Sequence, residues 1–311
     1  MENSNIVIET EQLSKKFDDK WAVSNIDLTV REGQIFGFLG PNGAGKSTFI
    51  RMLTSLLKPS KGQYKLFGQK PGIFNKQIYS RVGTLIEEPC FYNYLTGEQN
   101  LTHLSYLSGN QSKSRINKIF ERIDLNEAKS INVSEYSHGM KKRLALAQAL
   151  VHEPELLILD EPTSGLDPDG VQKVEELLLE LNNKKNITIF LSSHNLQRLQ
   201  SICDHMALIH FGKLIEKGPV SELLGQTEFL TTEVVVDQPQ AALELLLNKK
   251  WANKVSIDQD NKIKLHISQG LRPKLVKLLV KNGFKVYSLQ ARSSLKDHYF
   301  SIVNQQSNQT K

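Results

Sequence analysis

Residues 40–47 carry the sequence Gly-Pro-Asn-Gly-Ala-Gly-Lys-Ser, and this stretch decides the fold. It follows the apolar run QIFGFLG (34–40) and leads into the helical pattern STFIRMLTSLL (47–57), which is the strand-to-helix context that a phosphate-binding loop requires. The glycines let the backbone curl so that successive amides point at one anion, and the following helix adds its positive end. The sequence therefore predicts a P-loop.

Within this loop, Lys46 is expected to reach the β and γ phosphates of ATP, and the Ser47 hydroxyl is a hard oxygen ligand suited to Mg²⁺. The alternative is a glycine-rich turn with an incidental lysine, but a chance match to this pattern is expected only on the order of once per hundred such chains. The predicted nucleotide-binding residues of the loop are Gly40, Pro41, Asn42, Gly43, Ala44, Gly45, Lys46, Ser47 and Thr48.

A second acidic site follows the apolar run in ELLILDEP (155–162). A strand that ends at Asp160 delivers a carboxylate to the carboxyl edge of the sheet, where it can hold Mg²⁺. Glu161 is then the candidate general base that orients and deprotonates the attacking water. Taken alone, Asp-Glu after an apolar run indicates a turn or a helix cap, but the upstream P-loop favours the catalytic interpretation.

The order of elements predicts an α/β fold with a mostly parallel sheet, because apolar strands alternate with helical patterns up to about residue 215. Polar, helix-compatible residues near 90–137 predict a small helical insert. Past Gly225 the chain continues as short strands and two helices, interpreted as a βαββαβ appendage. The predicted domains are 1–222, with the helical subdomain at about 90–137, and an α+β domain at 223–311.

Composition indicates an ordinary globular protein, with 39% hydrophobic and 23% charged residues. No secretion signal and no apolar run of membrane-spanning length is visible, which predicts a cytoplasmic protein. The net charge of +6 lies in the last segment, since residues 1–222 carry 26 basic and 26 acidic side chains and residues 223–311 carry 13 and 7. This excess of positive charge favours binding to an anionic membrane leaflet or to a phosphate-bearing partner. The alternative is a lysine-rich face that is simply solvated. Cys90 and Cys203 predict neither a disulfide nor a zinc site.

Together with the two motifs above, further residues within 1–222 resemble the ATP-binding cassette (ABC) family. Tyr-Ser-His-Gly-Met (136–140) stands where the family has its Leu-Ser-Gly-Gly-Gln signature loop, and matches it at Ser137 and Gly139. Without the family, a Ser-x-Gly ahead of a helix is an N-cap. Ser-Gly-Leu-Asp (164–167) resembles the D-loop, which ends in Asp167.

The resemblance implies a P-loop NTPase cassette with a RecA-like core, a small antiparallel β portion and a helical insert. It implies that Ser137 and Gly139 grip ATP held by a second cassette, expected to be an identical copy, with Asp167 crossing the dimer boundary. It places His194 as the switch histidine that contacts the γ phosphate, and Phe17 as the aromatic that stacks on adenine. Trp21 is the alternative candidate for stacking on adenine, and packing in the core is the alternative role for Phe17.

Glu87 stands where the family usually has glutamine, at a position that meets magnesium and water. With Glu88-Pro89 it resembles the subgroup that exports peptide antibiotics such as bacitracin and lantibiotics, and residues 294–300 (SLKDHYF) resemble the end of such exporters. This implies an ATPase at the inner face of the membrane that works with separate permease subunits, with Glu87 as a further catalytic and metal residue. The alternatives are a soluble ABC ATPase acting on nucleic acid or ribosomes, for which only the basic tail argues, and an importer ATPase with a C-terminal regulatory domain.

Overall fold

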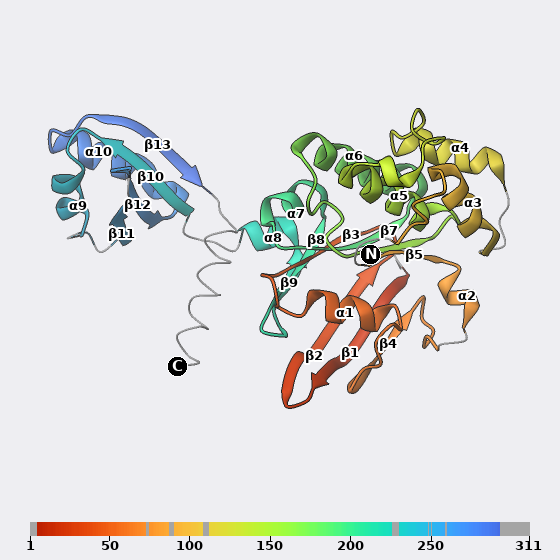
Figure 1. Ribbon diagram of the computed structural model, residues 1–311. Helices are drawn as coiled ribbons and strands as arrows, with labels where there is room; N and C mark the ends of the chain where they lie inside the picture. Colours follow the sequence, from red (N-terminus) through yellow and green to blue (C-terminus); the bar gives the residue numbers. More distant parts are fainter. Residues whose placement is uncertain are drawn as a thin grey trace. The chain divides into compact units, whose positions relative to one another are not determined.

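The computed structural model describes residues 5–72, 75–86, 90–107, 112–225, 230–247, 249, 251–258 and 260–292. The chain divides into two compact units, Met1–Pro219 and Val220–Lys311, so the division falls three residues before the predicted boundary at 222. Figure 1 shows the order of the elements, and each unit is described by itself.

The first unit is built on a six-stranded sheet in the order β5-β6-β7-β3-β8-β9. The first five strands pair in parallel, and β9 runs antiparallel to β8. The strands are β3 (Ile35–Leu39), β5 (Val82–Leu85), β6 (Leu156–Leu159), β7 (Thr188–Ser193), β8 (His205–His210) and β9 (Lys213–Pro219). Every residue of β3, β6 and β7 is buried, as expected for strands covered on both faces.

A three-stranded antiparallel sheet, in the order β2-β1-β4, lies beside the core sheet (Figure 1). Its strands are β1 (Ile6–Phe17), β2 (Lys20–Arg31) and β4 (Lys61–Leu66). The inner faces of both sheets share one apolar core around α1 (Lys46–Leu53), in which the rings of Phe38 and Phe49 stack with centroids 4.8 Å apart and Phe190 packs against both. This core fixes the strand and the helix on either side of the P-loop.

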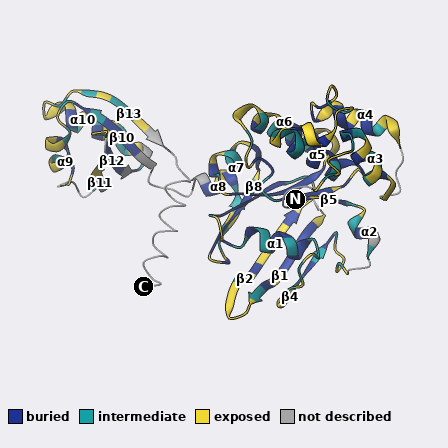
Figure 2. Cartoon of the chain, viewed as in Figure 1, coloured by how far each residue is buried: buried dark blue, intermediate teal, exposed yellow. Residues whose placement is uncertain are grey.

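Helices complete the first unit, and Figure 2 shows buried residues alternating with exposed ones along α3, α4 and α6. The helical insert contains α3, α4 and a short 3₁₀ helix, Val133–Glu135. The helices are α2 (Lys76–Tyr79), α3 (Gly97–Leu107), α4 (Lys113–Arg122), α5 (His138–Leu150), α6 (Pro168–Lys185) and α7 (Leu196–Ile202).

The second unit is the predicted βαββαβ arrangement, preceded by α8 (Val220–Gly225). Its antiparallel sheet has the order β11-β12-β10-β13, and the two helices cover a core of its own. The elements are β10 (Leu230–Val236), α9 (Pro239–Leu247), β11 (Asn253–Ile257), β12 (Ile263–Ile267), a 3₁₀ turn (Gln269–Leu271), α10 (Arg272–Lys281) and β13 (Val286–Arg292). The α+β assignment of this segment is confirmed.

Residues 206–215 have the strand-like sequence MALIHFGKLI, but they do not form a single strand. The backbone turns at Phe211 and Gly212, whose φ angles are 46° and 74°, and separates β8 from β9. The apolar run hides this hairpin because apolar residues stand on both sides of the turn, up to Ile215. The thiols of Cys90 and Cys203 are both free, and burial raises the pKa of Cys203.

Candidate functional site

The P-loop begins where β3 ends at Leu39 and closes at Gly45, the residue that caps α1. Gly45 has a φ of 106°, and a Cβ atom there would lie 2.4 Å from the carbonyl oxygen of Ala22 in β2. Only glycine fits this backbone and this close approach. The loop is therefore held between the core sheet and the antiparallel sheet, at the start of a helix whose positive end can face an anion.

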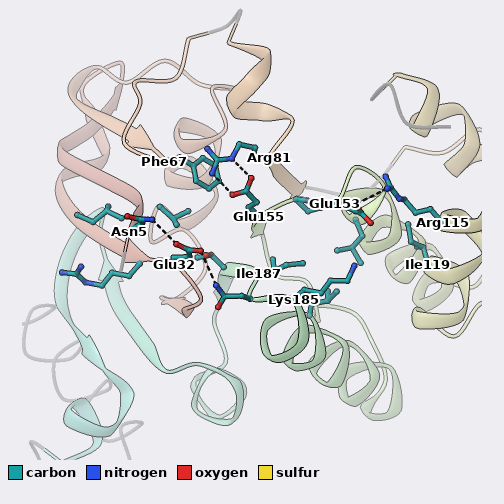
Figure 3. Close-up of a pocket in the computed structure, with 18 of the residues that line it drawn as sticks. Asn5, Glu32, Phe67, Arg81, Arg115, Ile119, Glu153, Glu155, Lys185 and Ile187 are labelled. Atoms are coloured by element: carbon teal, nitrogen blue, oxygen red, sulfur yellow. Dashed lines mark hydrogen bonds and ion pairs between the residues drawn. The ribbon is translucent and has the colours of Figure 1, made fainter. Parts of the chain in front are cut away.

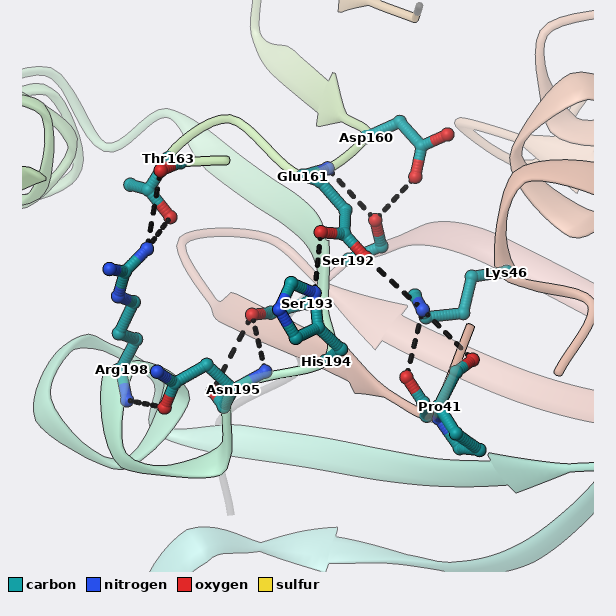
Figure 4. Close-up of polar contacts among 11 residues, drawn as sticks. Pro41, Lys46, Asp160, Glu161, Thr163, Ser192, Ser193, His194, Asn195 and Arg198 are labelled. Atoms are coloured by element: carbon teal, nitrogen blue, oxygen red, sulfur yellow. Dashed lines mark hydrogen bonds and ion pairs between the residues drawn. The ribbon is translucent and has the colours of Figure 1, made fainter. Parts of the chain in front are cut away.

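Lys46 is almost fully buried, with 6% of its side chain exposed. Its Nζ donates to the carbonyl oxygens of Gly40 and Pro41, at 2.8 and 3.2 Å, and lies 3.2 Å from Oε1 of Glu161 (Figure 4). A buried ammonium needs such partners because desolvation penalises its charge. The same ammonium is placed to donate to phosphate oxygens in exchange for the carboxylate.

Asp160 and Glu161 follow β6 at the carboxyl edge of the sheet, as predicted. The hydroxyl of Ser192 links them, because it donates to Oδ1 of Asp160 and accepts the backbone N–H of Glu161 at 3.0 Å. Glu161 has a φ of 46°, a left-handed conformation that is uncommon for a residue other than glycine and occurs often at functional sites. Sequence reasoning missed Ser192, although a polar residue near the end of the buried strand β7 is the signal that points to it.

His194 lies one residue beyond β7, and its Nδ1 is 2.7 Å from Oε2 of Glu161 (Figure 4). Glu161 thus stands between Lys46 and His194, one carboxylate oxygen facing each. Only 22% of the Glu161 side chain is exposed, against 52% for His194. This joins the predicted base, the phosphate-binding lysine and the switch histidine in one chain of contacts.

A cavity of about 630 Å³ opens over these groups. Eight of the predicted site residues line it: Asn42, Gly43, Gly45, Lys46, Ser47, Thr48, Asp160 and Glu161. Five residues that were not predicted complete the lining: Ala22, His138, Lys142, Ser164 and Gly165. The P-loop and the Asp160–Glu161 motif therefore meet at one hollow, although more than a hundred residues separate them in the chain.

Ser137 and Asp167 begin helices in this structure. The Ser137 hydroxyl accepts the N–H of Met140 at 3.2 Å and caps α5, and the Asp167 carboxylate accepts the N–H of Gly170 at 3.0 Å and caps α6. Ser137, Gly139 and Asp167 do not belong to the described lining of the cavity. Within one chain, Ser137 is therefore a helix N-cap, which is the alternative interpretation of the Ser-x-Gly motif.

His138, which departs from the family pattern as Tyr136 and Met140 also do, packs against the D-loop. A Cβ atom at Gly165 would lie 2.8 Å from its Nε2, and the φ of 75° at Gly165 itself favours glycine. The signature loop and the D-loop are therefore in direct contact beside the phosphate cavity.

Phe17 and Trp21 lie at the turn between β1 and β2, and their side chains are 47% and 37% exposed. Lys15 Nζ lies 5.2 Å from the ring centroid of Phe17, and Lys61 Nζ lies 5.6 Å from that of Trp21. The alternative role of Phe17 in the core is wrong, because nearly half of the ring faces solvent. Glu87 and the segment 294–300 lie outside the described residues.

Comparison with known proteins names the family. A family model described as ABC transporter matches residues 23–164. The bacitracin transport ATP-binding protein BcrA of Bacillus licheniformis is 38% identical over 298 residues, which cover 96% of this chain and 97% of the relative. This chain belongs to the ABC transporter ATP-binding proteins.

Two further matches agree with this assignment. BcrA of Enterococcus faecalis is 37% identical over 298 residues, covering 96% of each chain. Among solved structures, cbiO1 of Clostridium perfringens, part of the ABC transporter complex cbiONQ, matches with a TM-score of 0.64 and 28% identity, covering 72% of this chain and 92% of that one. The predicted cassette fold and the ATPase assignment are confirmed, and the ABC subunit binds ATP. None of the helices in the described part of the chain combines the length and apolar character that a membrane crossing requires.

Proposed function

We propose that this ABC ATPase hydrolyses Mg-ATP at the cavity over Lys46 and Glu161 and thereby powers the export of a peptide antibiotic or similar amphiphile through separate membrane subunits. The observation that carries the chemical part is the contact chain from Lys46 through Glu161 to His194. The export part is supported by the likeness to bacitracin transport ATP-binding proteins, which extends over 96% of the chain and so includes both units.

The residues around the cavity fit a magnesium ion. Ser47 and Asp160 line the same hollow and offer a hydroxyl and a carboxylate. No group of three or more His, Cys, Asp or Glu side chains suited to a metal occurs among the described residues. One hydroxyl and one carboxylate suit an ion that keeps waters and shares substrate phosphates, as Mg²⁺ does, and do not make a closed protein cage. When bound, the ion would neutralise charge on the phosphate oxygens.

Glu161 is proposed as the general base and Lys46 as the phosphate ligand. Nucleotide phosphates entering the P-loop compete for the Lys46 ammonium and release Glu161 from its ion pair. The freed carboxylate then orients a water toward the terminal phosphate and accepts its proton. His194, already 2.7 Å from Glu161, holds the carboxylate and is placed to contact the same phosphate group.

A second, identical cassette is proposed to complete the site. Ser137 and Gly139 begin a helix whose amide end can grip an anion, yet they lie outside the described lining of the cavity in their own chain. A head-to-tail pair would bring them against the ATP on the partner's P-loop, with Asp167 near the boundary. Phe17, half exposed at the β1–β2 turn, is proposed to stack on adenine.

The proposed location is the cytoplasmic face of the cell membrane, where such a subunit would meet its permease. The test is drug tolerance in a bacterium that carries the gene. Deletion should lower the tolerated concentration of bacitracin or a lantibiotic, and the wild-type gene should restore it while the Glu161→Gln variant does not. Unchanged tolerance in the deletion strain to every peptide antibiotic tested would refute the export proposal and leave the ATPase assignment intact.

A further inference from the structure

A second large hollow, of about 1310 Å³, lies at the opposite edge of the core sheet from the P-loop. Arg81, Glu155 and Thr188, at the starts of β5, β6 and β7, line it, whereas the nucleotide site lies beyond the strand ends. Figure 3 shows the antiparallel sheet on one side of this hollow and α4 with the end of α6 on the other. We call it the basal hollow.

The basal hollow is lined by seven basic and four acidic side chains. Three of the acids are already ion-paired: Glu9 with Lys65 at 2.8 Å, Glu153 with Arg115 at 3.0 Å, and Glu155 with Arg81 at 2.6 Å. The fourth acid, Glu32, contacts the side-chain amides of Asn5 and Asn186 at 3.4 Å. The acids of the lining therefore leave part of its positive charge unneutralised.

Three cations carry this excess on the α4 and α6 side of the hollow: Lys118, Arg122 and Lys185. Within the described residues, their side chains form no ion pair and no hydrogen bond. Each is exposed, so each can move to meet a ligand.

The spacing of the basic residues on α4 is costly for the helix by itself. Arg115, Lys118 and Arg122 stand at i, i+3 and i+7, which is one face, and like charges three or four residues apart destabilise a helix. Arg115 also lies in the first turn, where the helix dipole disfavours a cation. Arg115 contacts the carboxylate of Glu153 and the carbonyl oxygen of Val151, and no acid of the described residues pairs with Lys118 or Arg122. Arg122 lies in the last turn, where the helix dipole favours a cation, so the repulsion along the row is compensated only in part. Such a conflict with local rules is expected at functional sites.

Lys185 faces this row from the end of α6 and feels the positive charge of the row. Partial desolvation first, and then the guanidinium groups of Arg122 and Arg115, lower the pKa of Lys185, although Glu153 and Glu180 act in the opposite direction. The favourable place of Lys185 at a helix C-terminus explains its presence there but not the basic row opposite. A bound anion would relieve the repulsion between the two helices.

We propose that the basal hollow binds a small polyanion with two or more phosphate groups, held by Arg115, Lys118 and Arg122 of α4 together with Lys185 of α6. Arginine forks match phosphate oxygens in pairs and lysine supplies point charges, so a compact multivalent phosphate uses both. The ligand would tie the helical insert to the core at a place separate from the nucleotide.

The test is calorimetric titration of the full chain with inorganic tripolyphosphate without Mg²⁺. The P-loop also attracts this probe, so the titrations are made in the Lys46→Ala background, which removes the loop's phosphate ligand. We expect binding to persist there and to weaken at least tenfold on Arg122→Gln combined with Lys185→Gln. The matched control is Lys184→Gln, which neutralises the neighbouring lysine, paired with Glu180 and outside the described lining.

Binding should also weaken as salt is raised, because it depends on charge. Loss of all binding in the Lys46→Ala chain, or equal binding by the double variant and the Lys184→Gln control, would overturn the proposal. Capture of a hexaglutamate peptide in preference to tripolyphosphate would overturn it as well, since the hollow would then serve an acidic segment of a protein. None of these outcomes would bear on the proposed nucleotide site, because all the titrations are made in the Lys46→Ala chain.

Discussion

Replacing Glu161 with glutamine separates nucleotide binding from hydrolysis, because the change keeps the shape of the side chain and removes its charge and its basicity. In the nucleotide-free chain Lys46 loses one of three acceptors but keeps the carbonyl oxygens of Gly40 and Pro41 at 2.8 and 3.2 Å. Losing a hydrogen-bonded charged partner costs about 1–3 kcal/mol. The phosphates of ATP replace that partner, so the cost disappears in the complex.

The variant is therefore expected to bind ATP more tightly, by roughly five- to 150-fold if the whole cost is recovered on binding. Its kcat should fall by about 10² to 10⁴, which corresponds to about 2.7–5.4 kcal/mol of barrier, because no general base remains. Calorimetry measures the first quantity and phosphate release under saturating Mg-ATP the second. The control is Glu176→Gln, the same chemical change on the exposed face of α6. A kcat for Glu161→Gln within about threefold of the wild-type value would refute the assignment of the base.

Three further predictions concern stability. Phe190→Ala should lower the free energy of unfolding by about 3–5 kcal/mol in urea denaturation, because the fully buried ring packs against both Phe38 and Phe49. A loss below about 1 kcal/mol would contradict the shared core. Gly165→Ala should lower the free energy of unfolding by about 1–2 kcal/mol because of the positive φ, and by a further amount because the new methyl group clashes with His138. Adding His138→Ala should restore only the part due to the clash. Full additivity of the two substitutions would therefore argue against the contact. Burial holds the pKa of His152 below its ordinary value, so the unfolded chain takes up the proton first as pH falls from about 7 to 5, and the free energy of unfolding decreases. His152→Gln should make the free energy of unfolding less dependent on pH in this range. An unchanged pH dependence would count against the role of His152.

Much of the fold could be predicted because its signals are local. Buried strands are continuous apolar runs, and the glycine-rich turn before Lys46 has few other interpretations. The hairpin between β8 and β9 was missed because residues with positive φ, here Phe211 and Gly212, occupy a turn that the apolar pattern does not mark.

The candidate site was predictable to the extent that one motif supplies each group. Lys46, Asp160 and Glu161 come from motifs, and the structure brings them to one cavity. Ser192 and His138 join them only through tertiary contacts between β6 and β7 and between the signature loop and the D-loop, which no spacing along the chain encodes. The basal hollow likewise needs α4 and α6 to face each other.

The central claim is that the loop around Lys46 holds the triphosphate of a nucleotide. Calorimetric titration of the purified chain with Mg-ATP tests it most directly. We predict one saturable site per chain in the wild-type protein and at least a hundredfold weaker binding after Lys46→Ala, about 2.7 kcal/mol or more. Equal affinity of the two proteins for Mg-ATP would contradict the account.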